Sequence, residues 1–357
     1  MDLKDLRQAI DGIDDAIHDL LMQRAELVLQ VGHVKGRTLD APFYRPEREA
    51  QIHTRLGQRH QGPLPVAAVH RIFREIISAS LSLEKQLVVA YLGPEATHTH
   101  QATLKHFGSS CRMAPCRSME ELFQEVEVGR ADYGVVPVEH STEGMEYHTL
   151  DCFVDSPLRI CAEIVLPVSY NLLTNATSLE EVTVIYGHFQ ALADCHNWLD
   201  KNISSIPRRT TESTAQALEE AHRQPNAAAI GGVYAADTYG LAIMAEHIED
   251  QGNDENRFLV VGRHEPAPSG LDKTSLMFSL QDHPGFLYQI LGIFAQRGIN
   301  LSRLESRPSR RRPWDYLFFV DLQGHQGDDN IRPALQELAR IPGVFTKILG
   351  SYPHHVL

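Results

Sequence analysis

Residues 282–301 read Asp-His-Pro-Gly-Phe-Leu-Tyr-Gln-Ile-Leu-Gly-Ile-Phe-Ala-Gln-Arg-Gly-Ile-Asn-Leu, and residues 303–308 read Arg-Leu-Glu-Ser-Arg-Pro. The first four residues predict a turn, because Pro284 and Gly285 both interrupt regular secondary structure. Apolar residues then recur at helical spacing: Phe286, Leu287, Ile290, Leu291 and Phe294. Gly298 ends the predicted helix, since glycine is the commonest residue just after a helix C-terminus.

The segments around this helix complete a recognisable order. We expect strands at 275–280, 316–322 and 347–350, and a second helix at 331–339. With the segment after Gly298 as a further strand, the order is βαββαβ, which is ferredoxin-like. A simpler interpretation makes Pro284 and Gly285 only a turn, and Glu305 and Arg307 only surface charge. The complete order of elements favours the ferredoxin-like fold.

Together with a second motif, Leu349-Gly-Ser-Tyr-Pro353, this region resembles an ACT regulatory domain of the type found at the end of prephenate dehydratases. Such domains sense phenylalanine. The resemblance implies that phenylalanine is an effector of this protein and binds at an interface between ACT domains. It also implies the residues that bind it, which are Gly285, Leu287, Glu305, Ser306, Arg307 and Pro308.

The bulk properties exclude several classes of protein. A chain of 357 residues has room for two or three domains, and its net charge of −13 argues against nonspecific binding to nucleic acid. The five cysteines show no zinc spacing, so we expect free thiols, no metal and no other cofactor. We find neither an apolar signal region nor a run long enough to span a bilayer, which predicts a soluble, cytoplasmic protein.

The sequence shows two candidate domain boundaries. A helical segment ends just before the apolar strand at 87–92, and a linker rich in proline and glycine occupies 263–270. The predicted domains are therefore 1–86, 87–265 and 270–357, the last being the ACT-like region.

The first domain begins with one long helix. Apolar residues follow a three/four spacing at Leu3, Leu6, Ile10, Ile13, Ile17, Leu20, Leu27, Val31 and Val34. Thirty residues of helix are about 45 Å long, which exceeds the width of a globule of this size. The helix must therefore project and find a partner, most simply a second copy of itself. The sequence predicts a homodimer.

Cations lie beside this apolar stripe. Arg24 and Lys35 are three helical turns apart and share a face, which suits a dianionic ligand because guanidinium groups bind carboxylates bidentately. The alternative is that both are solvated surface cations, the usual state of Lys and Arg. The pattern alone favours neither interpretation.

The segment resembles an all-helical chorismate mutase of the AroQ class, and the resemblance implies a role for each matching residue. Arg24 would bind one carboxylate of chorismate, and Arg48 would support the other. Lys35 and Glu84 would face the breaking ether oxygen from opposite sides. Three further residues complete the implied site: Arg7 from the partner subunit, Glu49 at the substrate hydroxyl, and Ser80 in placing the substrate.

The middle domain alternates strands and helices, which indicates an α/β fold. It resembles a prephenate dehydratase, with two α/β lobes like those of periplasmic binding proteins and the substrate between them. The matching motifs are Leu92-Gly-Pro-Glu95, Val136-Pro-Val-Glu139, Thr149-Leu-Asp151, Asp155-Ser-Pro157, Gln190-Ala-Leu-Ala193, Thr211-Glu-Ser-Thr214 and Asn256-Arg-Phe-Leu-Val260.

The chain departs from this family where the motifs carry chemistry. The family's Thr-Arg-Phe triplet is Asn256-Arg257-Phe258 here, and that threonine has a central part in expelling the ring hydroxyl. An asparagine amide donates a hydrogen bond but is no useful proton donor. Two other changes introduce His98 and His140, and imidazoles can be protonated near neutral pH.

The resemblance implies a catalytic group and a substrate-binding group in this domain. The catalytic candidates are Glu139, His140, His188, Gln190, Asn256 and Arg257, although Arg257 could instead brace its loop. The substrate-binding candidates are Thr97, Ser141, Ser213, Thr214 and Phe258, and Ser213 could instead be an ordinary helix cap.

Three interpretations of the middle domain stay open at this point. It is a dehydratase in which a histidine or Asn256 replaces the threonine, a domain retuned to another reaction such as decarboxylation of prephenate without loss of the hydroxyl, or a noncatalytic binding module. The resemblances together favour a bifunctional enzyme, with chorismate and prephenate as substrates and phenylalanine as effector. The dimers could pair further into a tetramer through the ACT domains.

Overall fold

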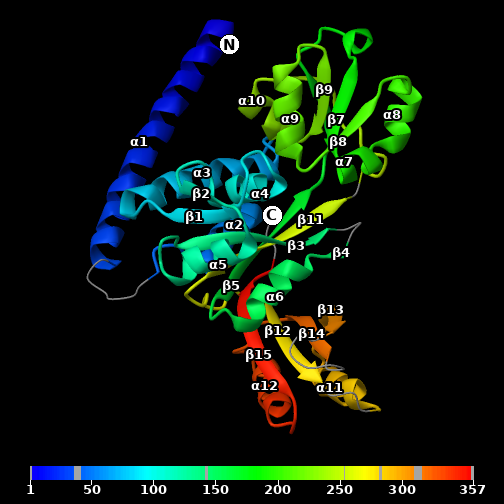
Figure 1. The fold of residues 1–357 in the computed structure, drawn as a ribbon. Helices are drawn as coiled ribbons and strands as arrows, with labels where there is room; N and C mark the ends of the chain where they lie inside the picture. The colour runs from blue at the N-terminus through cyan, green and yellow to red at the C-terminus, as the bar shows by residue number, and fades with distance from the viewer. Residues whose placement is uncertain are drawn as a thin grey trace.

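The computed structural model describes residues 2–35, 42–140, 144–252, 254–280, 284–308 and 316–354. They form a helical domain, a two-lobed α/β domain and a four-stranded α+β domain in chain order (Figure 1). This confirms the predicted fold class. No described helix is both long enough and apolar enough to cross a lipid bilayer.

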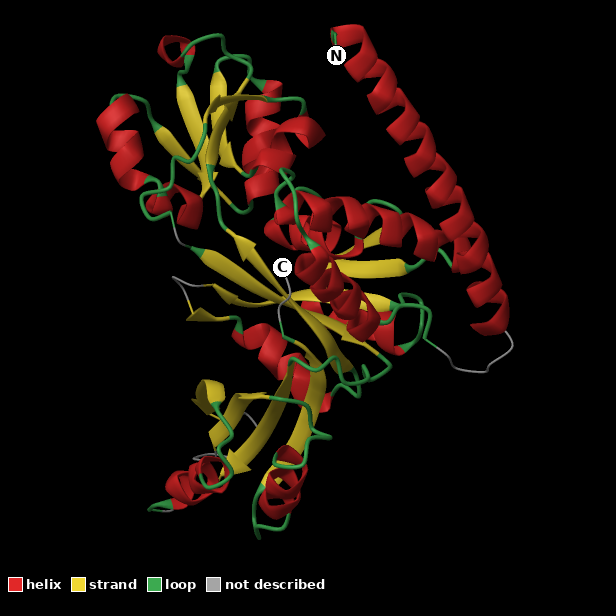
Figure 2. Cartoon of the chain, turned by 180° about the vertical axis from the view of Figure 1, so that it is seen from behind, coloured by secondary structure: helices red, strands yellow, loops and turns green. Residues whose placement is uncertain are grey.

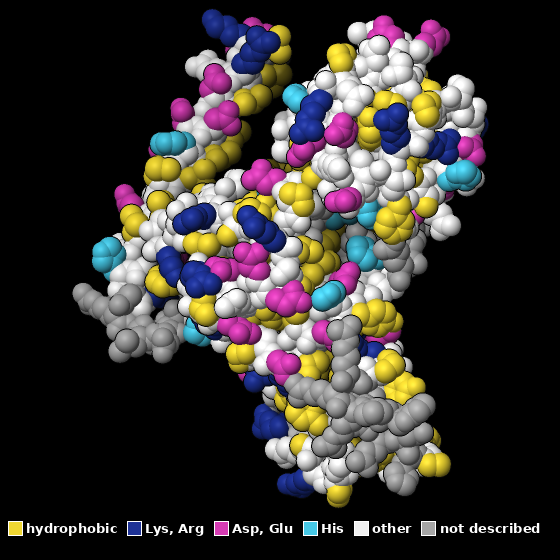
Figure 3. All heavy atoms as spheres, in the orientation of Figure 1, with side chains coloured by type: hydrophobic (Ala, Val, Ile, Leu, Met, Phe, Trp, Pro, Cys, Tyr) yellow, Lys and Arg dark blue, Asp and Glu magenta, His cyan; other side chains and the backbone are white. Residues whose placement is uncertain are grey.

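The helical domain consists of α1 (Leu3–Lys35), α2 (Pro46–Arg59) and α3 (Val66–Glu84). The Asp2 carboxylate caps α1, since its Oδ1 accepts from the backbone N–H groups of Lys4 and Asp5. α1 buries none of its residues. Its N-terminal part stands clear of the rest of the chain in both views (Figures 1 and 2). Hydrophobic side chains gather along one side of it (Figure 3).

The first lobe of the α/β domain is built on one mixed sheet of order β2-β1-β3-β11-β5, with β4 (Gly144–Met145) added to β3. Its strands are β1 (Val88–Leu92), β2 (Arg112–Cys116), β3 (Tyr133–His140), β5 (Arg159–Pro167) and β11 (Glu255–Gly262). Its helices are α4 (His98–Phe107), α5 (Met119–Glu127) and α6 (Tyr147–Asp155). β1 is parallel to both neighbours, whereas β11 is antiparallel to β3 and β5.

The second lobe is inserted between β5 and β11. Its strands are β6 (Asn171–Thr174), β7 (Val184–His188), β8 (Arg208–Thr211), β9 (Ala227–Gly231) and β10 (Ala242–Ala245), in the order β10-β6-β9-β7-β8. Its helices are α7 (Phe189–Asp194), α8 (His196–Ile203), α9 (Thr214–Arg223) and α10 (Val233–Tyr239), with a 3₁₀ turn at Leu179–Glu181. The chain crosses between the lobes twice, once after β5 and once before β11.

The C-terminal domain has the predicted βαββαβ order. It comprises β12 (Asp272–Leu280), α11 (Phe286–Ala295), β13 (Leu301–Pro308), β14 (Tyr316–Gln323), α12 (Ile331–Ala339) and β15 (Phe345–Pro353). Its sheet is ordered β13-β14-β12-β15. Gly285 has a φ of +78° at the start of α11, a conformation that glycine adopts without strain.

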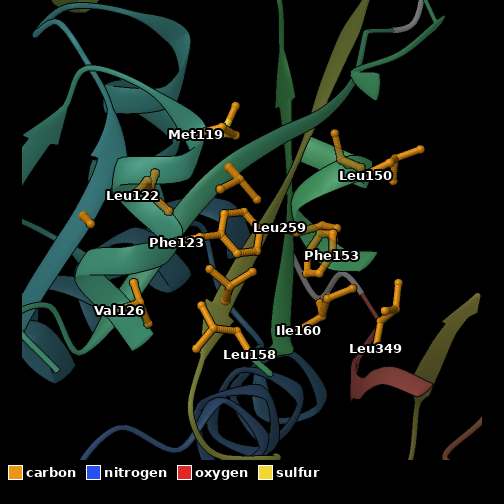
Figure 4. Close-up of a cluster of buried hydrophobic side chains, with 14 of the residues drawn as sticks. Met119, Leu122, Phe123, Val126, Leu150, Phe153, Leu158, Ile160, Leu259 and Leu349 are labelled. Atoms are coloured by element: carbon orange, nitrogen blue, oxygen red, sulfur yellow. The ribbon is translucent and has the colours of Figure 1, made fainter. Parts of the chain in front are cut away.

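The C-terminal sheet packs on the first lobe through one continuous core. Phe123 of α5, Phe153 of α6, Leu259 of β11 and Leu349 of β15 belong to the same buried cluster (Figure 4). The backbones come so close that a Cβ at Gly350 would lie 2.3 Å from the carbonyl oxygen of Ile160. The two domains are therefore joined by packing as well as by their linker.

Candidate active sites

The helical domain encloses a cavity of about 580 Å³. Its walls come from all three helices, from the segment at 43–45, and from Ala267 and Pro268 of the linker between β11 and β12. Six residues predicted for the mutase site line it: Arg24, Lys35, Arg48, Glu49, Ser80 and Glu84. Helical spacing accounts for two of them, because Arg24 and Lys35 project from the same face of α1.

Polar contacts inside the cavity are already arranged in pairs. The Lys35 ammonium donates to Glu84 Oε2 at 2.8 Å and to the Phe43 carbonyl at 3.1 Å. The Arg24 guanidinium donates to the Ser80 hydroxyl, which in turn donates to the Ile76 carbonyl at 2.6 Å. Burial lowers the pKa of Arg24, although it stays a cation at neutral pH. The cations Arg24 and Lys35 and the Glu84 carboxylate thus already have hydrogen-bond partners within the cavity.

Arg7 is not brought to this cavity. It lies on the projecting part of α1, about 25 Å along the helix from Arg24. Within one chain, Arg7 is absent from the described residues that line the cavity. Its assignment to the cavity of a partner subunit stays a prediction.

The α/β domain brings three polar side chains into one hydrogen-bonded row. Asn256 of β11 is in register with His140 of β3, and Asn256 Oδ1 lies 2.9 Å from His140 Nδ1. Asn256 Nδ2 lies 3.2 Å from Nδ1 of His98, the first residue of α4. His188, at the end of β7 in the second lobe, lowers the pKa of His98 by charge repulsion. The row therefore lies close to the second lobe.

The expectation that His98 can be protonated near neutral pH is wrong. Burial lowers the pKa of His98 to about 4, and the neighbouring His140 and His188 lower it further in the same direction. Its ring also lies against Tyr170 of the second lobe, with 5.9 Å between the ring centroids. His98 is therefore a neutral imidazole at physiological pH.

Other predicted residues of this domain lie at helix N-termini. Thr97 and Ser213 are the N-caps of α4 and α9, where their hydroxyls accept from the backbone N–H groups of His100 and Gln216. Thr214 is the first residue of α9. Ser213 and Thr214 therefore lie together at a helix N-terminus, where anions bind readily. Gln190 Nε2 donates to Asp194 within α7 at 2.8 Å. Ser141 falls outside the described residues.

Three predicted residues of this domain point elsewhere. The Arg257 guanidinium contacts Glu163 Oε2 at 3.0 Å and Asp321 Oδ2 at 2.7 Å, so it braces the two domains rather than joining Asn256. Phe258 is 1% exposed and belongs to the core between the sheet and α4. Glu139 is ion-paired with Arg303 of β13. Strand alternation explains Arg257 and Glu139, because each is next to a residue of the hydrogen-bonded row and so points to the opposite face of the sheet. Phe258 is two residues after Asn256, on the same face, where it belongs to the hydrophobic core beside α4.

The residues predicted to bind phenylalanine divide between two faces of β13. Glu305 accepts from the Tyr147 hydroxyl at 3.1 Å, and Arg307 is ion-paired with Asp151, so both face α6. Ser306 and Pro308 are exposed on the other face. Gly285 is exposed at the start of α11, and Leu287 is half-buried on that helix.

Sequence reasoning missed several neighbours of these sites. Tyr44, Ala267 and Pro268 line the mutase cavity, and Tyr170 lies against His98. The ion pairs of Arg257 also went unforeseen. No local pattern marks any of these residues, because each contact joins segments distant in the sequence.

Comparison with known proteins agrees with this geometry. Family models described as "Chorismate mutase type II", "Prephenate dehydratase" and "ACT domain" match residues 6–85, 89–266 and 274–340. A bifunctional chorismate mutase/prephenate dehydratase of Aquifex aeolicus is 46% identical over 360 residues, covering 100% of this chain and 99% of the relative. One from Pseudomonas aeruginosa is 43% identical, covering 99% and 98%.

A solved structure resembles the last two domains. It is a prephenate dehydratase from Arthrobacter aurescens in complex with L-Phe, with a TM-score of 0.69 and 34% identity, covering 75% of this chain and 90% of that one. Full-length identity to the two relatives, and three matching domains in the same order, establish the relationship. The chain belongs to the bifunctional chorismate mutase/prephenate dehydratase family.

Proposed function

We propose that this chain converts chorismate to prephenate in its helical domain and prephenate to phenylpyruvate, with loss of CO2 and water, in its α/β domain. Phenylalanine is the proposed effector, acting through the ACT domain. The observation that carries the proposal is the cavity that gathers Arg24, Lys35, Arg48 and Glu84. Full-length family membership supports the second activity.

The mutase cavity suits a unimolecular rearrangement of a dianion. Arg24 and Arg48 are cations that can bind two carboxylates and hold the substrate in a compact conformation. Lys35 donates to the ether oxygen, on which negative charge develops as the bond breaks. No proton transfer is needed, so positioning and charge stabilisation account for the catalysis.

The dehydratase reaction requires more from its site. The ring loses CO2 and hydroxide together, and the leaving hydroxide must receive a proton or a strong hydrogen bond. The row of His98, Asn256 and His140 lies where the two lobes approach each other, as indicated by the effect of His188 on His98. This row offers imidazole chemistry where a threonine is expected from the family resemblance.

Two further parts of the proposal concern assembly and control. The apolar stripe of α1 is 45–67% exposed, which supports a homodimer in which the stripe is covered and Arg7 enters the partner's cavity. Light scattering should give twice the chain mass of 40.0 kDa. The L-Phe complex of the Arthrobacter protein supports phenylalanine as the effector.

Supplying chorismate alone to the purified chain tests both activities in one experiment. Prephenate should appear first and phenylpyruvate later, as followed by NMR. A Lys35→Ala variant should stop the first step, yet still convert added prephenate, because the two sites are separate. If Lys35→Ala rearranged chorismate at the wild-type rate, the cavity would not be the mutase site.

A further inference from the structure

The Asn256 amide lies between two imidazoles, and each contact is fixed by backbone structure. Asn256 and His140 are paired residues of adjacent antiparallel strands, and their side chains meet at 2.9 Å. His98 is held from the other side by the first turn of α4, at 3.2 Å. Asn256 is only 5% exposed, so packing keeps its amide in this place.

The chemistry of the amide makes the two rings unequal. An amide oxygen only accepts hydrogen bonds, so His140 must carry a proton on Nδ1 to bond Asn256 Oδ1. An amide NH2 group only donates, so His98 Nδ1 must be unprotonated. His98 is thus held as the neutral Nε2–H tautomer. The Nδ1–H group of His140 donates to Asn256. A proton that makes this ring an imidazolium is therefore bound at Nε2.

The charged surroundings keep this assignment. His140 on β3 and His188 at the end of β7 both act on His98 of α4, and each lowers its pKa. The adjacent carboxylate, Glu139, is ion-paired with Arg303 of β13, a residue of the other domain. The low pKa of His98, about 4, means that it adds no positive charge beside His140 at neutral pH.

We propose that His140 is the acid that protonates the departing hydroxyl of prephenate, and that Asn256 is the positioning residue that orients its ring. This inference rests on the proposed dehydratase function. The bond from the ring to the carboxylate breaks and releases CO2, and its electron pair enters the ring. The bond from the ring to the hydroxyl breaks, and the hydroxide takes the Nε2 proton of His140 to leave as water. His140 is left neutral and regains a proton from solvent.

An Asn256→Asp variant separates positioning from a structural role. The carboxylate still accepts from His140 Nδ1–H, but its negative charge favours the imidazolium. We expect the alkaline limb of the kcat profile to move up by about one pH unit or more. If Asn256 were only structural, kcat would change without movement of the limb, and that result would overturn its assignment.

A His140→Gln variant tests the acid. We expect kcat for prephenate to fall about 100-fold or more, with KM changed less, because general acid catalysis contributes on this scale. His222→Gln, at an exposed histidine on α9, is the matched control and should behave as wild type. Mutase activity in the same sample reports whether each variant is folded.

The product identifies which claim fails. If the wild type releases phenylpyruvate and His140→Gln retains its kcat, the acid is another group and this inference is wrong while the dehydratase function stands. If the wild type releases no phenylpyruvate, the proposed function fails and the inference falls with it. Phenylpyruvate from the wild type, with loss in His140→Gln and a shifted limb in Asn256→Asp, supports both.

Discussion

The Arg257 guanidinium contacts the Asp321 carboxylate at 2.7 Å, across the boundary between β11 of the dehydratase domain and β14 of the ACT domain. Arg257 is the residue after Asn256. Arg303 of the ACT domain is likewise paired with Glu139, the residue before His140. The ACT domain therefore contacts both β3 and β11, each time at the residue adjacent to a member of the His140–Asn256 pair.

We expect phenylalanine, the proposed effector, to act on the dehydratase site through these contacts. Arg303 lies on β13, the strand that also carries four of the residues predicted to bind phenylalanine. Arg303→Ala should weaken inhibition of the dehydratase by phenylalanine about tenfold, since allosteric couplings are typically 1–3 kcal/mol. Arg340→Ala, an exposed residue after α12, is the control. Equal inhibition curves for Arg303→Ala and wild type would exclude this route.

The position of Glu84 in the mutase cavity predicts the effect of replacing it by glutamine. A carboxyl group donates to the ether oxygen only when it is protonated, whereas a glutamine donates at any pH. In the ligand-free cavity, Glu84 accepts from Lys35 at 2.8 Å. Glu84→Gln should therefore keep at least the wild-type mutase kcat/KM, because the amide can donate to the ether oxygen. A large fall in kcat/KM of the variant would refute this role.

The linker supplies a wall of the mutase cavity, which predicts a charge effect at Ala267. Chorismate is a dianion, so Ala267→Glu should raise its KM severalfold and Ala267→Lys should not, since opposite charges at one position act with opposite sign. The difference should shrink in high salt. Dehydratase activity and the same substitutions at exposed Ala295 serve as controls. Equal KM values for the two charged variants would show that the linker does not meet the substrate.

His98 predicts loss of stability in acid. Its pKa of about 4 in the fold lies below the ordinary value of 6.5, so the unfolded chain binds the proton more readily between these limits. The stability is complete above about pH 6.5 and is lost as pH falls towards 4. The effect is at most about 3 kcal/mol, from 1.4 kcal/mol for each pKa unit.

Thermal unfolding of a His98→Gln variant measures this effect, since glutamine can still accept from Asn256. The melting temperature of the variant should decline less than that of wild type between pH 6.5 and 4. Parallel declines would mean that His98 is not the responsible group.

The sequence predicted those parts of the molecule that depend on local patterns. Helical spacing placed Arg24 and Lys35 on one face of α1, and both line the cavity. Sequence reasoning failed where the face of a strand, or the position along it, decides which side chain enters the site. Asn256, Arg257 and Phe258 are consecutive, yet they reach a histidine row, an ion network and a core. A motif gives the order of such residues but not which of them points into the site.

Other features depend on contacts that no local pattern reveals. Ala267 lines the mutase cavity although it lies more than 180 positions along the chain from Glu84, the last residue of the helical domain that lines it. The low pKa of His98 comes first from burial, which the sequence does not give. The pairing of Arg257 with Asp321 was not predicted either, because it joins two strands of different domains.

The central claim is that this chain dehydrates prephenate although Asn256 stands where its family resemblance places a threonine. The most direct test is to incubate the full chain with prephenate near pH 7.5 and identify the product by NMR against an enzyme-free control. The account predicts phenylpyruvate, formed faster than in the control. A dihydro-hydroxyphenylpyruvate, which keeps the ring hydroxyl after CO2 is lost, or no turnover by a chain that still rearranges chorismate, would contradict it.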